Sequence, residues 1–341
     1  SDNDVFSGHS HGRSVLSCMA AILEGQLIGT APQADYVLLR TEDADSEYIV
    51  EEDNWIAGAE LADSIGCDVL NTSLGYTRFN DPTQDHHPTE LDGNSIRISI
   101  AAGIASQKGM IPVVSAGNSG SSDWYYISAP ADAHDILAVG AVGDVGNYAP
   151  FSSHGPSADG RVKPDVVAMG WGTLGVNDGG DSTVAINGTS FASPLVAGLV
   201  ACLWQLHPQR TAQEIMQAVR ESASLFDQPN DSLGHGIPNF MLANDLLISM
   251  GIADLHVQGP TVFPVPFTDE LNIAIDHTGK VDLTLHDLAG RIVWSRSNVQ
   301  ANDRIITLND PKFRSIGNGT YLLALSGDGL DMVKKVVKSD H

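Results

Sequence analysis

The chain has 341 residues, of which 42% are hydrophobic and only 6% aromatic, and 34 are glycine. This length allows one large core and a second small domain, and the composition suits a loop-rich α/β protein better than a helical bundle. With 18 basic against 42 acidic residues, the formal net charge is −24. Such a surface repels phosphate backbones and anionic lipid, which argues against nucleic-acid and membrane-surface partners. No apolar run approaches the ~20 residues that span a bilayer.

Strands alternate with helices as far as residue 251. Helices are expected at 13–23, 54–65, 95–108, 189–207 and 212–222, and strands at 33–39, 67–73, 110–115, 136–142 and 166–169. Strands that alternate with helices of 10 to 15 residues form a mostly parallel sheet covered on both faces. We therefore expect an α/β domain over residues 1–251.

The pattern changes after Gly251. A linker is expected at 252–262, and residues 263–341 read as short strands separated by turns, at 271–275, 282–288, 291–295, 304–308, 319–325 and 331–337. Leu283, Leu285 and Val293 alternate with polar neighbours, as in half-buried strands. This C-terminal part is predicted to be an immunoglobulin-like β-sandwich.

A serine begins an apolar helix, in the segment Asn187-Gly-Thr-Ser190-Phe-Ala-Ser-Pro194. The positive end of a helix favours negative charge near this oxygen. Gly188 allows a substrate carbonyl to approach the backbone, and the Ser190 N–H can bind an oxyanion. Taken alone, the same pattern is also that of an ordinary N-cap.

Two other segments contain residues that could act together with Ser190. His11 opens the first helix, and histidine is the usual general base for serine because its pKa lies near neutrality. Asn118 ends the apolar strand Val113-Val-Ser115-Ala-Gly-Asn118, where its side chain can donate a hydrogen bond to a developing oxyanion. Each residue alone would have an ordinary structural explanation.

Together, in this order, these motifs resemble the subtilisin family over about residues 9–250. The resemblance implies a secreted serine endopeptidase that forms an acyl-enzyme on peptide or protein substrates, with Ser190 as nucleophile, His11 as general base and Asn118 as oxyanion donor. It also implies that Ser73-Leu74-Gly75, together with Ala116 and Gly117, binds the substrate backbone by strand addition.

The chain departs from the family pattern in two places. Arg13 stands where the family commonly has threonine, and a cation in the first helical turn opposes the helix dipole. The family's catalytic aspartate precedes the histidine by several tens of residues, and Asp2 and Asp4 lie too close to His11 for that role. We therefore expect the acid on a separate N-terminal companion fragment that stays bound.

The C-terminal module resembles the type A sorting domains of the type IX secretion route of Bacteroidetes. The likeness rests on Phe263–Leu271, Leu288–Arg291, Gly319–Leu322 and the basic pair Lys334-Lys335. It implies a secreted or cell-surface protein. A generic immunoglobulin-like accessory domain is the alternative.

Metal and cofactor signals are weak. Calcium would be a natural counter-ion for so acidic a chain, but no Asp-x-Asp-x-Asp-Gly loop with a closing Glu is present, so no metal ligand is assigned and structural calcium stays open. We expect the acidic stretch 42–53 to be solvated and His86-His87 to lie in a surface loop. The irregularly spaced Cys18, Cys67 and Cys202 are expected to be free, buried thiols.

Two other functions compete. Gly188–Ala192 loosely imitates the nucleophile elbow of an α/β-hydrolase esterase, which would take its acid from Asp227 or Asp231 and its base from His235. The second alternative is a catalytically impaired binding protein with the subtilisin fold, which would need no reactive Ser190.

Overall fold

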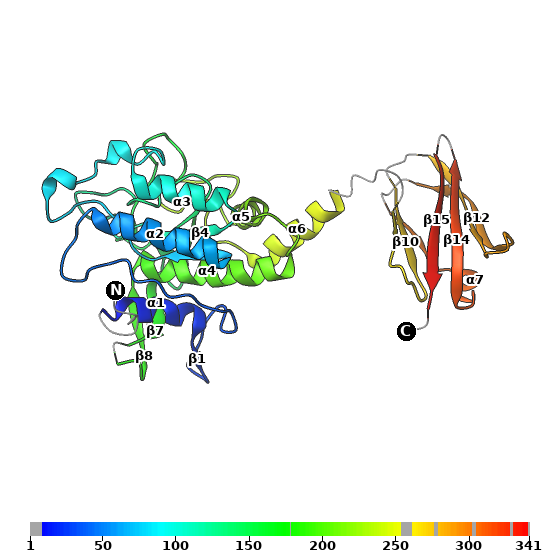
Figure 1. The fold of residues 1–341 in the computed structure, drawn as a ribbon, viewed down its shortest axis with the longest axis horizontal. Coiled ribbons are helices and arrows are strands. Elements are labelled where there is room, and N and C mark those ends of the chain that lie inside the picture. Colours follow the sequence, from blue (N-terminus) through cyan, green and yellow to red (C-terminus); the bar gives the residue numbers. More distant parts are fainter. Residues whose placement is uncertain are drawn as a thin grey trace. The chain divides into compact units, whose positions relative to one another are not determined.

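The computed structural model describes residues 9–177, 179–253, 261–275, 279–301, 305–327 and 330–339. The chain divides into two compact units after Ile248 (Figure 1). The first unit is the expected α/β domain. The described part of the second consists of the end of the last helix of the first part, strands and one short helix.

A four-stranded parallel sheet lies at the centre of the first unit. Its order is β3 (Val69–Thr72), β4 (Ile111–Ser115), β5 (Leu137–Val142) and β6 (Val166–Met169). All residues of β4 and β5 are buried. Such continuous burial is typical of parallel strands that are covered on both faces, because neither face can be polar.

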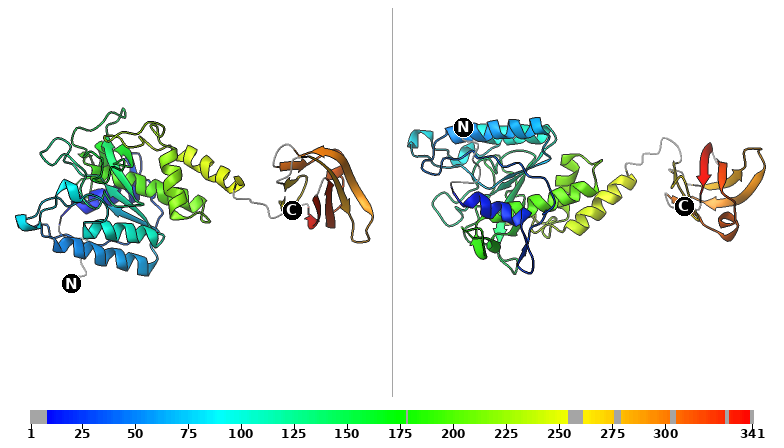
Figure 2. Two further views of the ribbon diagram at one scale, coloured as in Figure 1. Left: turned by 90° about the horizontal axis from the view of Figure 1, so that it is seen from above. Right: turned by 60° about the horizontal axis from the view of Figure 1, so that its bottom comes forward.

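Helices cover this sheet on both faces (Figure 2). The helix α4 (Thr189–Leu206) crosses one face and contacts all four strands, while α2 (Val50–Ile65) and α3 (Arg97–Gln107) pack on the other, where Trp55 and Ile98 join the core. By length and composition, α4 could cross a membrane, but most of it is buried inside this unit. The predicted α/β architecture is confirmed.

The histidine helix is shorter than predicted. The expected helix at 13–23 is α1 (His11–Ala20), which packs against α4. A small hairpin follows, formed by β1 (Ile22–Leu23) and β2 (Leu27–Ile28). A second hairpin that the sequence pattern missed, β7 (Trp171–Val176) with β8 (Thr183–Asn187), leads the chain into α4.

The prediction of a strand at 33–39 is wrong. The chain there is unpaired, and the side chains of Val37, Leu38 and Leu39 are 46%, 37% and 39% exposed. A strand requires a neighbour to complete its ladder of hydrogen bonds, and no described strand lies beside this segment. Within the described residues, β3 likewise pairs only with β4. We call residues 33–39 and the outer edge of β3 the open margin of the sheet.

The second unit contains two antiparallel sheets, β13–β10–β9 and β12–β11–β14–β15. Their strands are β9 (Thr261–Phe263), β10 (Leu271–Ala274), β11 (Lys280–His286), β12 (Ile292–Gln300), β13 (Ile305–Leu308), β14 (Gly319–Gly327) and β15 (Leu330–Lys338), with α7 (Pro311–Arg314) as the short helix. Leu283, Leu285, Trp294 and Phe313 form their shared core. This agrees with the predicted sandwich.

The segment between the units was predicted as a linker over 252–262. The last helix of the first part, α6, extends from Phe240 to Ala253, and β9 begins at Thr261. Residues 252–253 and 261–262 are therefore helical and extended respectively, and 254–260 lie outside the described residues. The helices α5 (Ala212–Glu221) and α6 complete the α-helical elements.

Candidate active site

Ser190 is the second residue of α4 and only 8% exposed. The residue before the helix, Gly188, has a φ of +151°. Residues with a Cβ rarely adopt this conformation because it strains the backbone. A Cβ built there would lie 3.5 Å from the Phe191 ring and 3.6 Å from the Asn118 Nδ2. Glycine therefore both permits the turn into α4 and keeps the space before Asn118 open.

Proline inside α4 creates an unusual link to β3. Pro194 has no N–H, so the carbonyl of Ser190, four residues earlier, cannot accept its normal helical hydrogen bond. Ser73 Oγ donates to this carbonyl instead, at 2.8 Å. The first turn of α4 is thus tied to the residue that directly follows β3.

Neighbouring side chains extend this link. Asn71 Nδ2 donates to Ser73 Oγ at 3.0 Å, and Ser193 Oγ donates to Asn71 Oδ1 at 2.9 Å. The Asn71–Ser73–Ser193 network therefore fixes α4 on the carboxyl ends of the strands. Sequence reasoning missed Asn71 and Ser193 as positioning residues, although a proline four residues after Ser190 signals a carbonyl in need of a donor.

The orientation of the Asn118 amide is determined by its neighbour. Its Oδ1 accepts hydrogen bonds from Thr189 N at 2.8 Å and from Thr189 Oγ1 at 3.1 Å. Because a backbone N–H can only donate, the oxygen must face Thr189, and the NH₂ group is left on the other side. Among the described residues, none accepts a hydrogen bond from Asn118 Nδ2. This amide can therefore donate to an incoming oxygen.

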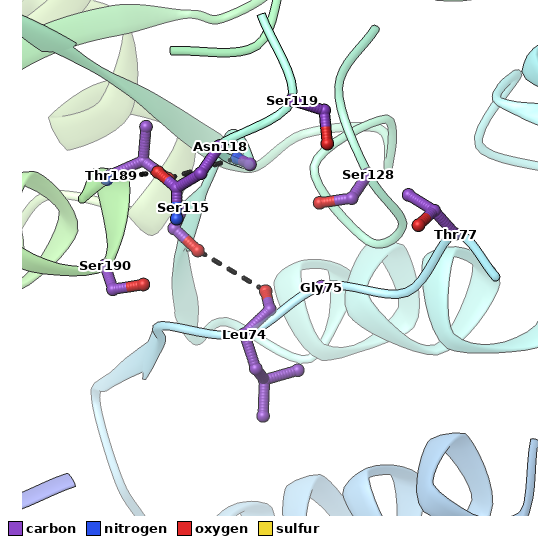
Figure 3. Close-up of a pocket in the computed structure, with 10 residues that line it drawn as sticks. Leu74, Gly75, Thr77, Ser115, Asn118, Ser119, Ser128, Thr189 and Ser190 are labelled. Carbon is purple, nitrogen blue, oxygen red and sulfur yellow. Dashed lines mark hydrogen bonds between the residues drawn. The ribbon is translucent and has the colours of Figure 1, made fainter. Parts of the chain in front are cut away.

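A cavity of about 160 Å³ gathers several predicted site residues (Figure 3). It is lined by Leu74, Gly75, Thr77, Ser115, Gly117, Asn118, Ser119, Ser128, Thr189 and Ser190. Of the predicted substrate-binding residues, Leu74, Gly75 and Gly117 line it. Ser73 contacts the carbonyl of Ser190 instead, and the fully buried Ala116 belongs to the core.

His11 lies beside α4 without lining this cavity. Its ring packs on Phe191 with the ring centroids 5.6 Å apart. Burial lowers the pKa of His11 below its ordinary value, and the neighbouring His9 adds to this shift. A lowered pKa leaves the imidazole neutral at pH 7, the form that accepts a proton.

No carboxylate of the described residues hydrogen-bonds the His11 ring. Asp2 and Asp4, which we had judged too close to His11 in the chain, lie outside the described residues. Arg13, the departure from the family pattern, is exposed. The described chain thus brings Ser190 and Asn118 to one cavity and places His11 against Phe191 of the same helix, with no described carboxylate bonded to the His11 ring.

The acidic stretch 42–53 is not uniformly solvated, contrary to the prediction. Glu51 and Glu52 are buried, and carboxylate oxygens of Glu42, Glu47 and Glu51 lie within 4.8 Å of one another. Both oxygens of Glu51 already accept backbone N–H groups, and Glu42 accepts from Tyr76. Because protein donors already engage Glu51 and Glu42, we assign no metal site to the cluster.

His86 also differs from the prediction of a surface loop. It is buried, and its Nε2 contacts Glu52. Only His87 is exposed. Of the three free cysteines, Cys18 is buried, Cys67 partly buried and Cys202 exposed, so the expectation of buried thiols holds for Cys18 alone.

The residues required by the esterase alternative do not meet at Ser190. His235 Nδ1 contacts the backbone carbonyl of Asp165, and its ring packs against Phe226. His235, Asp227 and Asp231 are absent from the cavity lining. The geometry offers no support for this alternative.

Comparison with known proteins agrees with this arrangement. The model of the subtilase family matches residues 1–236, and that of the secretion system C-terminal sorting domain matches residues 261–339. Subtilisin BL of Lederbergia lenta is 29% identical over 233 residues, which cover 68% of this chain and 76% of the relative. The membrane-bound transcription factor site-1 protease of Mus musculus is 31% identical over 258 residues, 71% of this chain.

The chain spans only 22% of the length of that mouse relative. Among solved structures, the self-cleaved protease domain of PatA is similar, with a TM-score of 0.57, 26% identity, and coverage of 70% of this chain and 84% of the other. These likenesses exclude the esterase alternative, and the sorting domain marks the protein for secretion. The chain belongs to the subtilase family.

Proposed function

We propose that this protein is a secreted serine endopeptidase in which Ser190 is the nucleophile, His11 the general base and Asn118 an oxyanion donor. The observation that carries the proposal is the Asn118 amide: Thr189 fixes its oxygen, so its NH₂ group is free beside the cavity that Ser190 lines. At the start of α4, the N–H groups of Gly188, Thr189 and Phe191 already donate to described acceptors, whereas that of Ser190 does not, so it can donate to the same oxyanion. Membership of the subtilase family supports the same roles.

The first chemical step forms the bond between Ser190 Oγ and the substrate carbonyl carbon. The hydroxyl proton passes to His11, and the carbonyl oxygen becomes an anion that accepts from Asn118 Nδ2. His11 then gives the proton to the leaving nitrogen as the C–N bond breaks, which leaves an acyl-enzyme. Water, deprotonated by His11, hydrolyses that ester and restores Ser190.

The acid that would orient His11 is proposed to lie on a companion segment docked at the open margin. Val37, Leu38 and Leu39 are half exposed there, and no described strand pairs with the outer edge of β3. A strand inserted at this margin would complete the ladder of β3 and cover these side chains. Its carboxyl end would then lie at the same edge of the sheet as Ser73 and Asn118, because parallel strands end together.

Activity-based labelling tests the catalytic roles. The secreted protein should react with a fluorophosphonate probe, and Ser190→Ala should abolish both labelling and peptide hydrolysis. Ser64→Ala, on the exposed side of α2, is the matched control and should still be labelled. Asn118→Ala should lower kcat by about 10²–10³-fold, the cost known for the equivalent donor in subtilisin. Unchanged labelling of Ser190→Ala would contradict the assignment and favour a non-catalytic binding protein.

The companion is tested separately by mass. Native mass spectrometry of the purified protein should give a larger mass than denaturing mass spectrometry, which should release the 36.1 kDa chain and a smaller fragment. The fragment should contain an apolar strand that ends in aspartate. A single 36.1 kDa species with full activity would overturn the companion, while leaving the roles of Ser190 and Asn118 to the labelling test.

A further inference from the structure

The cavity beside Ser190 contains a buried hydroxyl that has no partner. Ser128 is 5% exposed, and its Oγ makes no hydrogen bond in the described structure. Buried polar atoms are almost always satisfied, and an exception requires an explanation such as a ligand. Ser128 lines the same cavity as Ser190, so a group that enters this cavity can satisfy it.

The position of this hydroxyl is fixed by its backbone. Ser128 N donates to the carbonyl of Ala116 at 3.1 Å, and Ser128 O accepts from Ala131 N at 2.8 Å. The next residue, Ala129, exchanges two hydrogen bonds with Tyr76, directly after Gly75. The hydroxyl is thus held between the segments that follow β3 and β4.

Two glycines form the walls on either side of Ser128. A Cβ at Gly117 would lie 3.0 Å from Ser128 Oγ, and a Cβ at Gly75 would collide with it. Gly117 also has φ of +109°. The cavity is therefore a slot between two glycine backbones, closed at one point by the Ser128 hydroxyl, and a side chain that enters the slot must meet this group.

The chemistry of the remaining lining is polar and neutral. Thr77, Ser115 and Ser119 contribute further hydroxyls, and Leu74 is the one large apolar residue of the lining. None of the described lining residues carries a charge. The slot therefore offers hydrogen-bond donors and acceptors, but no ion pair for a basic or acidic side chain and little apolar surface for an aromatic one.

We propose that Ser128 selects substrates whose acyl-side residue, the one that supplies the scissile carbonyl, has a short neutral carboxamide or hydroxyl side chain, with asparagine preferred. An asparagine oxygen can accept from Ser128 Oγ, while its NH₂ donates to the other hydroxyls. Leucine has nearly the same shape and volume as asparagine, but it would leave the Ser128 hydroxyl and the other hydroxyls unpaired. Sites built to hydrogen-bond a substrate reject analogues that lack the group, whereas a single methylene discriminates weakly. This inference rests on the proposed endopeptidase function.

The test compares peptides that differ only at the acyl-side residue. The secreted protein should cleave the asparagine peptide with kcat/KM roughly tenfold above that of the leucine peptide, which corresponds to one hydrogen bond. Ser128→Ala should bring this ratio close to one. Ser106→Ala is a matched control, because Ser106 Oγ is also buried without a partner but lies on α3, outside the cavity lining. It should leave the ratio unchanged.

The outcomes separate the two proposals. Equal cleavage of both peptides, preference for leucine, or stronger cleavage of a lysine peptide would overturn the role of Ser128 while leaving the peptidase intact. Absence of cleavage together with absence of fluorophosphonate labelling would overturn the peptidase. In that case calorimetry with Ser190→Ala still decides the inference, because the asparagine peptide should bind about tenfold more tightly than the leucine peptide.

Discussion

The two margins of the catalytic sheet differ sharply. Beside β6, the chain supplies every partner of a buried charge: Asp165 Oδ2 accepts from Lys163 Nζ and from Ala138 N, each at 2.8 Å, and its Oδ1 accepts from Arg220 Nε at 2.9 Å. Beside β3, apolar side chains are exposed and backbone groups lack a described neighbour. The difference teaches that the described chain supplies the partners of buried groups at one margin of a sheet and not at the other.

The largest loss of stability is expected from replacing Asp165, at the margin beside β6. Asp165→Ala leaves Lys163, 2% exposed, with its charge uncompensated, and breaking a buried pair in this way costs about 3–5 kcal/mol. Asp159→Ala is the control, because its pair with Arg161 is partly exposed and such pairs contribute about 0–1 kcal/mol. Urea unfolding followed by tryptophan fluorescence measures both. Equal losses would show that the buried network does not govern this margin.

The same network predicts a dependence on acid. Burial would raise the pKa of Asp165, but the charges of Lys163 and Arg220 and its hydrogen bonds outweigh burial and hold the pKa at about 2. The folded state therefore binds this proton more weakly than the unfolded state does. The stabilisation is present above pH 3.8 and is lost as the pH falls through 2.

The contrast between the margins also explains what could be predicted from the sequence. Apolar strands such as 110–115 and 136–142 are correctly placed because both faces of each are buried and their patterns are continuous. The segment 33–39 has the same apolar pattern, but no described strand pairs with it. A local pattern does not report whether a segment has a strand to pair with.

The site shows the same limit. The motifs around Ser190 and Asn118 could be found because their residue types and order are specific. The partners that position them could not, since Ser73 and Thr189 reach them from segments more than 70 residues away. The buried state of Glu51 and His86 was missed for a related reason, because acidic and histidine-rich stretches are usually solvated.

A smaller loss of stability is expected where Ser73, the residue after β3, is hydrogen-bonded to α4. Ser73→Ala removes the donor to the Ser190 carbonyl, which Pro194 already deprives of its helical partner. An unsatisfied carbonyl costs about 1–3 kcal/mol when buried, and this site is partly buried, so a loss near the lower end is expected. Ser64→Ala, on the exposed side of α2, should cost less. A Ser73→Ala protein that unfolds at the unchanged urea concentration would mean that another donor replaces the hydroxyl.

The smallest effect on stability is expected at Glu47, in the loop between residues 33–39 and α2. Burial raises the pKa of Glu47 to about 7, and the nearby carboxylates of Glu51 and Glu42 add to the shift. The folded state therefore binds this proton more tightly than the unfolded state, so the contribution to stability is full below pH 4.5 and is lost as the pH rises through 7. Because Glu47 is partly exposed, solvent screens the effect and the change should be modest. Glu47→Gln should flatten the decrease in the urea midpoint between pH 5 and 8, while Glu60→Gln on α2 should not. If both variants retain the slope of the parent protein, the carboxylate cluster does not control stability in this loop.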